Sequence, residues 1–249
     1  MRKLLGFILS PIAILAFFLV LVIFQPTQWV AYKLFGYSAH KKVVDLLNLC
    51  LFSTVYLAGN TVTFINRQNL PTGRPIIFMA NHQSLLDIPP LIYYLRKYHA
   101  KFISKIELTR GIPSISYNLK VGGGANIDRN DPKQSLMEMA KLGTRMKENR
   151  WSTVIFPEGT RSKTGKVKPF QAGGVAIILK KCPEALIVPI AIDGSWEVVR
   201  YGLYPLNTFK KMTWEVLEPI ETDFGTVEER VKEAEHRIKK ALGQASSAI

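Results

Sequence analysis

The longest run of apolar residues lies at the start of the chain. Leu4 to Phe24 contain no charged residue over 21 positions and follow Met1, Arg2 and Lys3. At ~1.5 Å rise per residue, a helix of this length spans about 30 Å, which is enough to cross the hydrocarbon core of a bilayer. A cleaved signal peptide would have a shorter apolar run that ends in small residues, and this sequence does not. The segment is therefore predicted to stay in a membrane.

A second, less apolar segment runs from about Ser38 to Leu57. Its apolar residues recur every three to four positions, which is typical of a helix lying at an interface or against another helix. Because basic residues flank the first segment on both sides, the positive-inside rule gives no clear orientation for a single crossing. We therefore favour a two-helix hairpin embedded in the cytoplasmic leaflet over a single transmembrane span. Two buried helices of a soluble domain are a third alternative, disfavoured because residues 1–44 contain no acidic residue.

Beyond about Asn60, short apolar runs alternate with helical periodicity. This alternation predicts an α/β sandwich, with a mostly parallel or mixed sheet flanked by helices. The candidate strands are Thr61–Ile65, Pro75–Ala80, Ala100–Ser104, Thr153–Phe156, Leu186–Ile192 and Thr213–Leu217. The candidate helices are Ile88–Lys97, Lys133–Asn149, Gly174–Lys180 and Val227–Leu242, the last preceded by the capping box Thr226-Val-Glu-Glu229. The chain is thus divided into an N-terminal membrane-anchoring segment, residues 1–58, and a globular domain, residues 59–249.

Composition narrows the possible classes of protein. The 249 residues are 47% hydrophobic and carry a formal net charge of +14, so the chain is not a disordered polycation. Two cysteines, Cys50 and Cys182, are too few for a disulfide framework or a cysteine-rich zinc site. The basic residues are spread along the chain without interleaved aromatics, which argues against nucleic-acid binding. No metal-ligand cluster or organic cofactor motif is present in the sequence, and none is expected.

The most distinctive polar motif, Asn81 to Asp87 (NHQSLLD), directly follows an apolar strand. On one continuous helix His82 and Asp87 would lie about 140° apart and could not touch. With His82 in a loop and Asp87 in the first helical turn, the carboxylate can fold back onto one imidazole nitrogen and leave the other free to accept a proton. Alternatively, Ser84 and Asp87 form only a helix-capping box. A hydrolase with Ser84 as nucleophile is disfavoured, because no Gly-x-Ser-x-Gly turn surrounds it.

A second motif, Phe156 to Ser162 (FPEGTRS), also follows a predicted strand. Gly159 allows close backbone approach, Thr160 offers a hydroxyl and Arg161 offers a planar fork of donors, a set that suits a phosphate. The alternative is a solvated basic turn, since the loop continues into Lys163, Lys166 and Lys168. The spacing does not complete a P-loop, and the glycines at 122–124 do not complete a dinucleotide-binding motif.

Lys105 and Arg129 each follow a short apolar strand, so either can point to the same edge as His82; for each alone, a surface charge is the alternative. Taken together, the motifs resemble the glycerolipid acyltransferases, and within them the 1-acylglycerol-3-phosphate acyltransferases. The four blocks of that family are matched by Asn81, His82 and Asp87; by Gly124 to Arg129; by Phe156 to Ser162; and by Val188-Pro189-Ile190. The Lys-x-Glu-Leu pattern at 105–108 also fits, whereas Ala125-Asn126 replace the bulkier apolar residues usual in the second block.

The resemblance implies transfer of a fatty acyl group from acyl-CoA or acyl-carrier protein to the sn-2 hydroxyl of 1-acylglycerol-3-phosphate, which makes phosphatidic acid in phospholipid biosynthesis. His82 would be the general base and Asp87 would fix its tautomer, without a covalent acyl-enzyme. The residues implied to bind the acceptor phosphate are Lys105, Gly159, Thr160 and Arg161, with Arg129 as a further candidate. The residues expected to shape the site are Asn81, Ser84, Glu158, Val188 and Pro189, with Glu158 orienting its loop.

The same resemblance places the chain at a bacterial-type inner membrane, with the acyltransferase domain on the cytoplasmic face. There a positive surface would meet anionic phospholipids, a phosphate-bearing acceptor and an acidic acyl donor. Two alternatives stay open. One is an acyltransferase for another acceptor, such as glycerol-3-phosphate or a lysolipid without phosphate, and the other is a lipid-binding membrane protein in which His82 is incidental.

Overall fold

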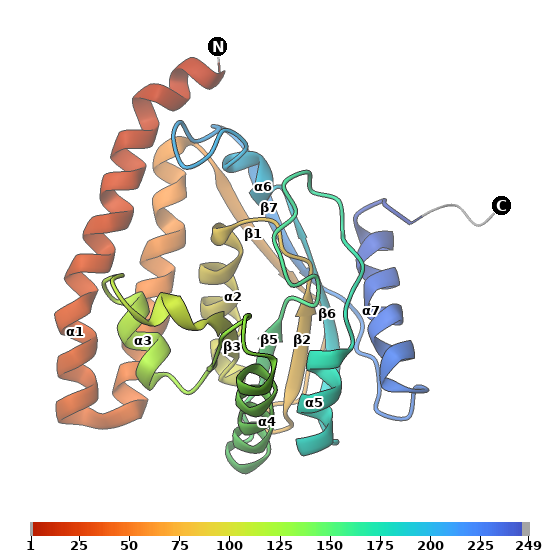
Figure 1. Cartoon of the computed structure of the whole chain (residues 1–249). Helices are drawn as coiled ribbons and strands as arrows, with labels where there is room; N and C mark the ends of the chain where they lie inside the picture. The colour runs from red at the N-terminus through yellow and green to blue at the C-terminus, as the bar shows by residue number, and fades with distance from the viewer. Residues whose placement is uncertain (1, 246–249) are drawn as a thin grey trace.

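The computed structural model describes residues 2–245 as a central sheet with helices on both faces (Figure 1). A long helical hairpin and α2 cover one face, and α4, α5 and α7 cover the other. The predicted α/β sandwich preceded by a two-helix hairpin is therefore confirmed.

Seven strands form the sheet, in the order β1-β7-β6-β2-β5-β3-β4. They are β1 (Thr61–Asn66), β2 (Ile76–Ala80), β3 (Lys101–Lys105), β4 (Ala125–Ile127), β5 (Thr153–Ile155), β6 (Leu186–Asp193) and β7 (Lys211–Val216). Strands β2 to β6 all run parallel, with Phe78 of β2 opposite Val154 of β5 and Val188 of β6. Strand β7 is antiparallel to β6 and parallel to β1. The carboxyl ends of five strands therefore meet at one edge of the sheet.

The central strand β2 shows why this region reads as uniformly apolar. Ile76 and Phe78 point into the core under the hairpin and α2, whereas Ile77 and Met79 point into the core under α4, α5 and α7. Because alternate residues of a strand face opposite sides, a strand covered on both sides has to be apolar throughout. All six predicted strands are present, with ends within two residues of those predicted. Strand β4, for which no bounds were predicted, is the short strand expected before Arg129.

The helices are α1 (Arg2–Ser53), α2 (Ile88–Tyr94), α3 (Ile115–Val121), α4 (Pro132–Asn149), α5 (Gly173–Lys181), α6 (Ser195–Val198) and α7 (Val227–Ala241), with 3₁₀ turns η1 (Thr54–Ala58), η2 (Leu85–Asp87), η3 (Arg96–Tyr98) and η4 (Ile106–Thr109). The predicted capping box of α7 is present, since the Glu229 amide donates to Thr226 Oγ1 at 3.2 Å and the Thr226 amide donates to Glu229 Oε2 at 2.7 Å. The helix predicted at 88–97 is divided into α2 and η3, and the short helices α3 and α6 were not predicted.

Helix α1 consists of two antiparallel arms, residues 2–35 and 37–53, joined at Gly36 (Figure 1). Gly36 has φ 75° and ψ −168°, a conformation that only glycine adopts at low cost. The first arm continues well beyond Phe24, where the apolar run ends, because its polar residues are paired with protein. Gln28 Nε2 donates to the Ser114 carbonyl at 3.3 Å, and Gln28 Oε1 lies 3.1 Å from Nε2 of His40 on the second arm.

The inner side of the hairpin is part of the protein core. Ala13 of the first arm is buried in the same cluster as Phe78 and Trp214 of the sheet, and so are Val55 and Ala58 of η1, directly after the second arm. The outer side of the first arm is different, because large apolar side chains along its length are exposed: Leu4, Ile8, Ile12, Leu15, Phe18, Leu19, Val22, Ile23, Leu34 and Phe35. The stretch Leu4–Ala58 is long and apolar enough to cross a membrane by length and composition.

Candidate active site

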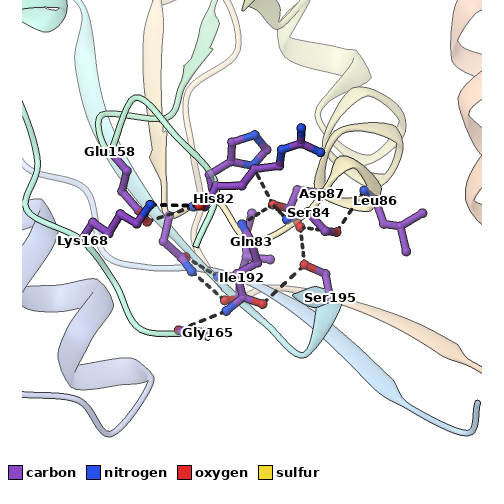
Figure 2. Close-up of polar contacts among 12 residues, drawn as sticks. His82, Gln83, Ser84, Leu86, Asp87, Glu158, Gly165, Lys168, Ile192 and Ser195 are labelled. Carbon is purple, nitrogen blue, oxygen red and sulfur yellow. Dashed lines mark hydrogen bonds and ion pairs between the residues drawn. The ribbon is translucent and has the colours of Figure 1, made fainter. Parts of the chain in front are cut away.

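His82 lies two residues beyond the end of β2, at the edge where the parallel strands end (Figure 2). Its Nδ1 is 2.8 Å from Asp87 Oδ2, so the predicted contact between the two residues is present. The imidazole stacks on the ring of Phe156, with centroids 4.0 Å apart and an interplanar angle of 16°. The hydrogen bond to Asp87 and the stacking on Phe156 together fix the position and the orientation of the imidazole ring. With Nδ1 donating to the carboxylate, Nε2 is the nitrogen left to accept a proton.

Asp87 is completely buried and is held by donors from two segments, residues 82–84 and Ser195. The amides of Gln83 and Ser84 donate to Oδ2 at 2.6 and 2.9 Å, and the hydroxyl of Ser195 donates to Oδ1 (Figure 2). These bonds stabilise a carboxylate that has no access to solvent. The capping box is also present, with Ser84 Oγ accepting the Leu86 amide at 3.0 Å. Asp87 therefore both contacts His82 and takes part in the helix-capping box, so the two roles considered for this motif coexist.

The loop after β5 holds the backbone of His82 from both sides. The His82 amide donates to Glu158 Oε1 at 3.0 Å, and the Ser162 amide donates to the His82 carbonyl at 2.7 Å. Both backbone polar groups of His82 are therefore hydrogen-bonded to the second sequence motif. This arrangement explains why the two motifs act as one structural unit although they lie more than 70 residues apart in the chain.

Glu158 is buried, and only one of its carboxylate oxygens is paired within the part of the chain that the structure describes. Burial raises the pKa of Glu158 from 4.5 to about 7, although the hydrogen bond from the His82 amide opposes the change. The side chain points at the backbone of His82 and does not line the cavity described next. This geometry agrees with an orienting role for Glu158.

A cavity of about 790 Å³ opens beside His82. Its polar part is lined by every residue expected to bind phosphate: Lys105, Arg129, Gly159, Thr160 and Arg161. Lys105 ends β3, and Arg129 follows β4 by two residues, so the parallel strands bring both to the edge occupied by His82. Lys168 braces the loop by donating to Thr160 Oγ1 at 3.0 Å and to the Arg161 carbonyl at 2.9 Å.

The rest of the cavity wall is mainly apolar and comes from the hairpin, α2 and α3. Among these residues are Phe17, Leu21, Leu47, Leu51, Ile92 and Ile115. A mostly apolar cavity with a few polar groups in one part of its wall is the usual form of a small-molecule binding site. The hairpin is therefore a structural part of the cavity as well as the segment with an exposed apolar face.

Lys101, which was not predicted as a site residue, also lines this cavity, at the opposite end of β3 from Lys105. It is buried, and its ammonium lies 4.1 Å from the ring centre of Trp151 and 4.7 Å from that of Tyr37. Burial, assisted by the positive charge of Lys41, lowers the pKa of Lys101 to about 7. Nothing in the local sequence distinguishes Lys101 from a surface lysine.

Like Ser84 and Glu158, three further residues expected to shape the site do not line the cavity. Asn81 pairs with the backbone of Ile192, donating to its carbonyl and accepting from its amide at 2.8 Å each. Val188 and Pro189 lie within β6, opposite Phe78 and Met79. These residues lock β6 to β2 and so support the strand that ends at His82.

Ser195 is a residue of the site that was missed, although a signal for it exists. It follows the end of β6 by two residues, directly after Gly194, and so reaches the same sheet edge as His82.

Among residues 2–245 no group of three or more His, Cys, Asp or Glu side chains is placed to hold a metal ion.

Comparison with known proteins agrees with this geometry. The family model described as Acyltransferase matches residues 61–193, which is more than half of the chain. A crystal structure of the 1-acyl-sn-glycerophosphate acyltransferase PlsC from Thermotoga maritima superposes with a TM-score of 0.80 at 25% identity, covering 98% of this chain and 97% of that one.

Curated relatives carry related names. The 1-acyl-sn-glycerol-3-phosphate acyltransferase of Helicobacter pylori is 35% identical over 182 residues, covering 71% of this chain and 70% of that protein. A chloroplast protein of the same name from Brassica napus is 34% identical over 142 residues, which cover 54% of this chain and only 38% of the longer relative. The region that the family model matches, residues 61–193, contains β1 to β6 together with both motifs at the cavity. The chain belongs to the Acyltransferase family.

Proposed function

We propose that this protein transfers a fatty acyl group from an acyl thioester to the sn-2 hydroxyl of 1-acylglycerol-3-phosphate, making phosphatidic acid. The observation that carries the proposal is the position of His82. Its imidazole is fixed by Asp87 at the point where an apolar cavity meets a cluster of cationic and hydroxyl groups. An acceptor with an acyl tail, a free hydroxyl and a phosphate fits these three features, and relatives named for this reaction support the assignment.

The chemistry requires a base, because an alcohol is a poor nucleophile until its proton is removed. His82 Nε2 accepts the proton of the acceptor hydroxyl as its oxygen attacks the thioester carbonyl. Asp87 stabilises the imidazolium that forms. When the tetrahedral intermediate collapses, the C–S bond breaks and His82 returns the proton to the departing thiolate. The new ester and the free thiol account for all atoms, and no residue of the protein is acylated.

The phosphate of the acceptor binds at the cationic part of the cavity. Arg161 supplies a planar fork of donors, Lys105 supplies a point charge from the end of β3, and Gly159 lets the backbone approach closely. Thr160 adds a hydroxyl that Lys168 already orients, and Arg129 completes the positive rim. The acyl tail of the acceptor or the donor then lies along the apolar wall formed by the hairpin, α2 and α3.

The exposed apolar face of α1 supports a membrane location for this reaction. The hairpin is proposed to lie in the cytoplasmic leaflet of a bacterial-type inner membrane, with the acyltransferase domain against the cytoplasmic surface. Anionic phospholipids would attract a chain of net charge +14. The acyl donor, acyl-CoA or acyl-carrier protein, is acidic and approaches the same positive surface.

The test is an assay of the purified full-length protein with 1-acylglycerol-3-phosphate and a panel of acyl-CoA and acyl-carrier-protein donors, with products identified by mass. His82→Ala is expected to lower turnover by at least about 10²-fold, the usual contribution of a positioned base. His236→Ala is the matched control, because His236 lies exposed on α7 and does not line the cavity. It should leave turnover unchanged.

Glycerol-3-phosphate and an acylglycerol without phosphate should be poor acceptors. A clear preference for either would assign the site to another acceptor class. Absence of turnover in both the wild type and His82→Ala, each shown by circular dichroism to be folded, would instead indicate a lipid-binding protein in which this histidine is incidental. Equal, measurable turnover of the two would show that His82 is not the base.

A further inference from the structure

The loop from Tyr201 to Phe209, between α6 and β7, presents apolar side chains to solvent from a rigid base. Leu203, Tyr204 and Phe209 are 61%, 52% and 54% exposed. In contrast, residues 205–208 are buried, with Leu206 in the core and the Asn207 amide donating to the Val198 carbonyl at 2.7 Å. The apolar side chains are therefore held outward by a fixed backbone.

This 201–209 loop packs directly on the amino-terminal turns of the hairpin (Figure 1). The ring of Tyr204 meets that of Phe7 edge to face, with centroids 5.5 Å apart, and the Leu206 amide donates to Ser10 Oγ at 2.7 Å. A Cβ atom on Gly6 would lie 2.5 Å from the Leu206 carbonyl oxygen, so the two segments approach as closely as backbones allow. Phe7 is itself 42% exposed, and the two apolar surfaces are continuous.

The loop also packs on the segment that follows the second arm. A Cβ atom on Gly59 would lie 2.6 Å from Cε1 of Phe209, so the ring covers this glycine. Just before it in η1, Tyr56 and Leu57 are also largely exposed. Exposed apolar residues from three separate segments, the start of α1, η1 and the 201–209 loop, therefore form one surface that continues the outer face of the hairpin.

The charges around the loop indicate what covers it. Arg200 and Lys211 flank the loop and are exposed, and no acidic residue occurs between Glu197 and Glu215. Tyrosine has an apolar ring with a polar tip and is enriched at the boundary between lipid headgroups and hydrocarbon. Basic residues beside such a boundary are attracted to anionic headgroups. An apolar tip with aromatic residues and cationic flanks is thus suited to a phospholipid surface.

We propose that the 201–209 loop is a second membrane contact, made by the globular domain itself, and that its partner is a phospholipid leaflet with anionic headgroups. The inference rests on the membrane location proposed above and extends it. If the hairpin were the only membrane contact, the domain could still rotate about the long axis of the hairpin relative to the membrane. A contact beside that axis removes this freedom and fixes the direction in which the cavity faces the membrane.

Depth measurements with nitroxide labels test the loop directly. Single cysteines replace Leu203, Ile8 of the hairpin and Met137 of α4 in full-length protein that carries Cys50→Ala and Cys182→Ala. The labelled proteins are reconstituted with vesicles of phosphatidylcholine and phosphatidylglycerol, and collisions with oxygen and with a water-soluble nickel chelate are compared. Met137 is the matched control, because it is 50% exposed on an element outside the proposed surface.

Labels at positions 203 and 8 should be accessible to oxygen and shielded from nickel, and the label at 137 should be accessible to nickel. A nickel-accessible label at 203 beside a lipid-exposed label at 8 overturns the loop contact and leaves the membrane location intact. Nickel access at both positions overturns the membrane location as well. A label at 203 shielded from both reagents shows that protein, such as a second copy of the chain, covers the loop, and this also overturns the proposal.

A charge substitution gives a functional readout. Leu203→Asp should lower partitioning onto the same vesicles by about tenfold, because a carboxylate at the depth of lipid chains costs more than ~1.4 kcal/mol. Turnover of vesicle-borne acceptor should fall in parallel, and turnover of a short-chain acceptor in detergent should not change. Met137→Asp should change neither. Unchanged partitioning of folded Leu203→Asp would refute the contact.

Discussion

At the scale of single residues, Ser195 is the clearest addition to the site. Its hydroxyl donates to Asp87 Oδ1, and the other partner of that oxygen is Ser84 Oγ at a longer 3.4 Å. We expect Ser195→Ala to lower kcat by about tenfold with little change in KM for the acceptor, since a hydrogen bond to a buried charge contributes ~1.5–3 kcal/mol.

Ser116→Ala is the matched control for this change. Ser116 Oγ donates to the Leu108 carbonyl at 2.9 Å and accepts from the Ile112 amide at 3.0 Å, so the variant also loses partly buried hydrogen bonds without touching Asp87. Its kcat should match that of the wild type. Equal kcat values for both variants would mean that Ser195 contributes to packing alone and does not act through Asp87.

Glu158 predicts a pH dependence of stability. Its pKa is about 7 in the folded protein and near 4.5 in the unfolded chain, so folding favours the protonated form. The contribution of protonated Glu158 to stability is complete below the unfolded-state pKa of 4.5 and is lost as pH rises through the folded-state pKa of about 7. The free energy of unfolding should therefore decrease between about pH 5 and about pH 8. Glu158→Gln keeps an oxygen to accept the His82 amide but cannot ionise, and should lack this part of the decrease.

Urea unfolding in detergent at a series of pH values measures the effect. Glu107→Gln serves as the control, because Glu107 is exposed in η4 and its replacement should preserve the wild-type pH dependence. A Glu158→Gln curve parallel to that of the wild type would contradict the assignment.

At the scale of secondary-structure elements, a long apolar pattern in the sequence was sufficient to predict the bounds of an element, and a short pattern was less reliable. Strand β2 was predicted correctly, because five consecutive buried residues leave a clear signal in the sequence. Strand β4 has three residues, and Gly124 before it lies so close to the Phe102 carbonyl that a Cβ would meet it at 2.6 Å. It is a strand because β3 pairs with it, which is a tertiary cause. Helix α3 is likewise defined by its contacts with the hairpin.

The candidate site was likewise predictable only in part from the sequence. The contact between His82 and Asp87 follows from local geometry, and the gathering of Lys105 and Arg129 follows from the rule that parallel strands end at one edge. Lys101 was not predictable, because its burial depends on Tyr37 and Trp151, which are distant in sequence. Folding alone brings such groups together.

The joint between the hairpin and α3 predicts a stability effect. Gln28 is fully buried and bridges His40 of the second arm and the Ser114 carbonyl. Gln28→Leu preserves the size of the side chain but leaves His40 Nε2 without this partner and removes one of the two donors to the Ser114 carbonyl, the other being the Asn118 amide at 3.0 Å. It should lower the free energy of unfolding by about 1–3 kcal/mol. Thr27→Ala, at an exposed position one residue away, should cost less than about 0.5 kcal/mol. Thermal unfolding in detergent distinguishes them, and equal melting temperatures would contradict a structural joint.

At the scale of the whole molecule, the sequence and the packing divide the chain differently. The change in composition near residue 58 separates an apolar segment from an α/β domain. The core crosses that boundary, because Ala13, Val55 and Ala58 pack with Phe78 and Trp214. Leu21, Leu47 and Leu51 of the hairpin also form part of the cavity wall. The segment 1–58 therefore has two separable roles, an outer face suited to lipid and an inner face that completes the domain.

Two variants separate these roles. Deletion of residues 1–58 removes both faces, so we expect loss of turnover even on a short-chain acceptor in detergent, together with a lower melting temperature. Leu15→Ser combined with Leu19→Ser changes only the outer face, where these side chains are 61% and 50% exposed. This variant should bind vesicles more weakly and act slowly on vesicle-borne acceptor, yet retain wild-type turnover on the short-chain acceptor. Wild-type turnover of the deletion variant on that acceptor would show that the hairpin is an anchor alone.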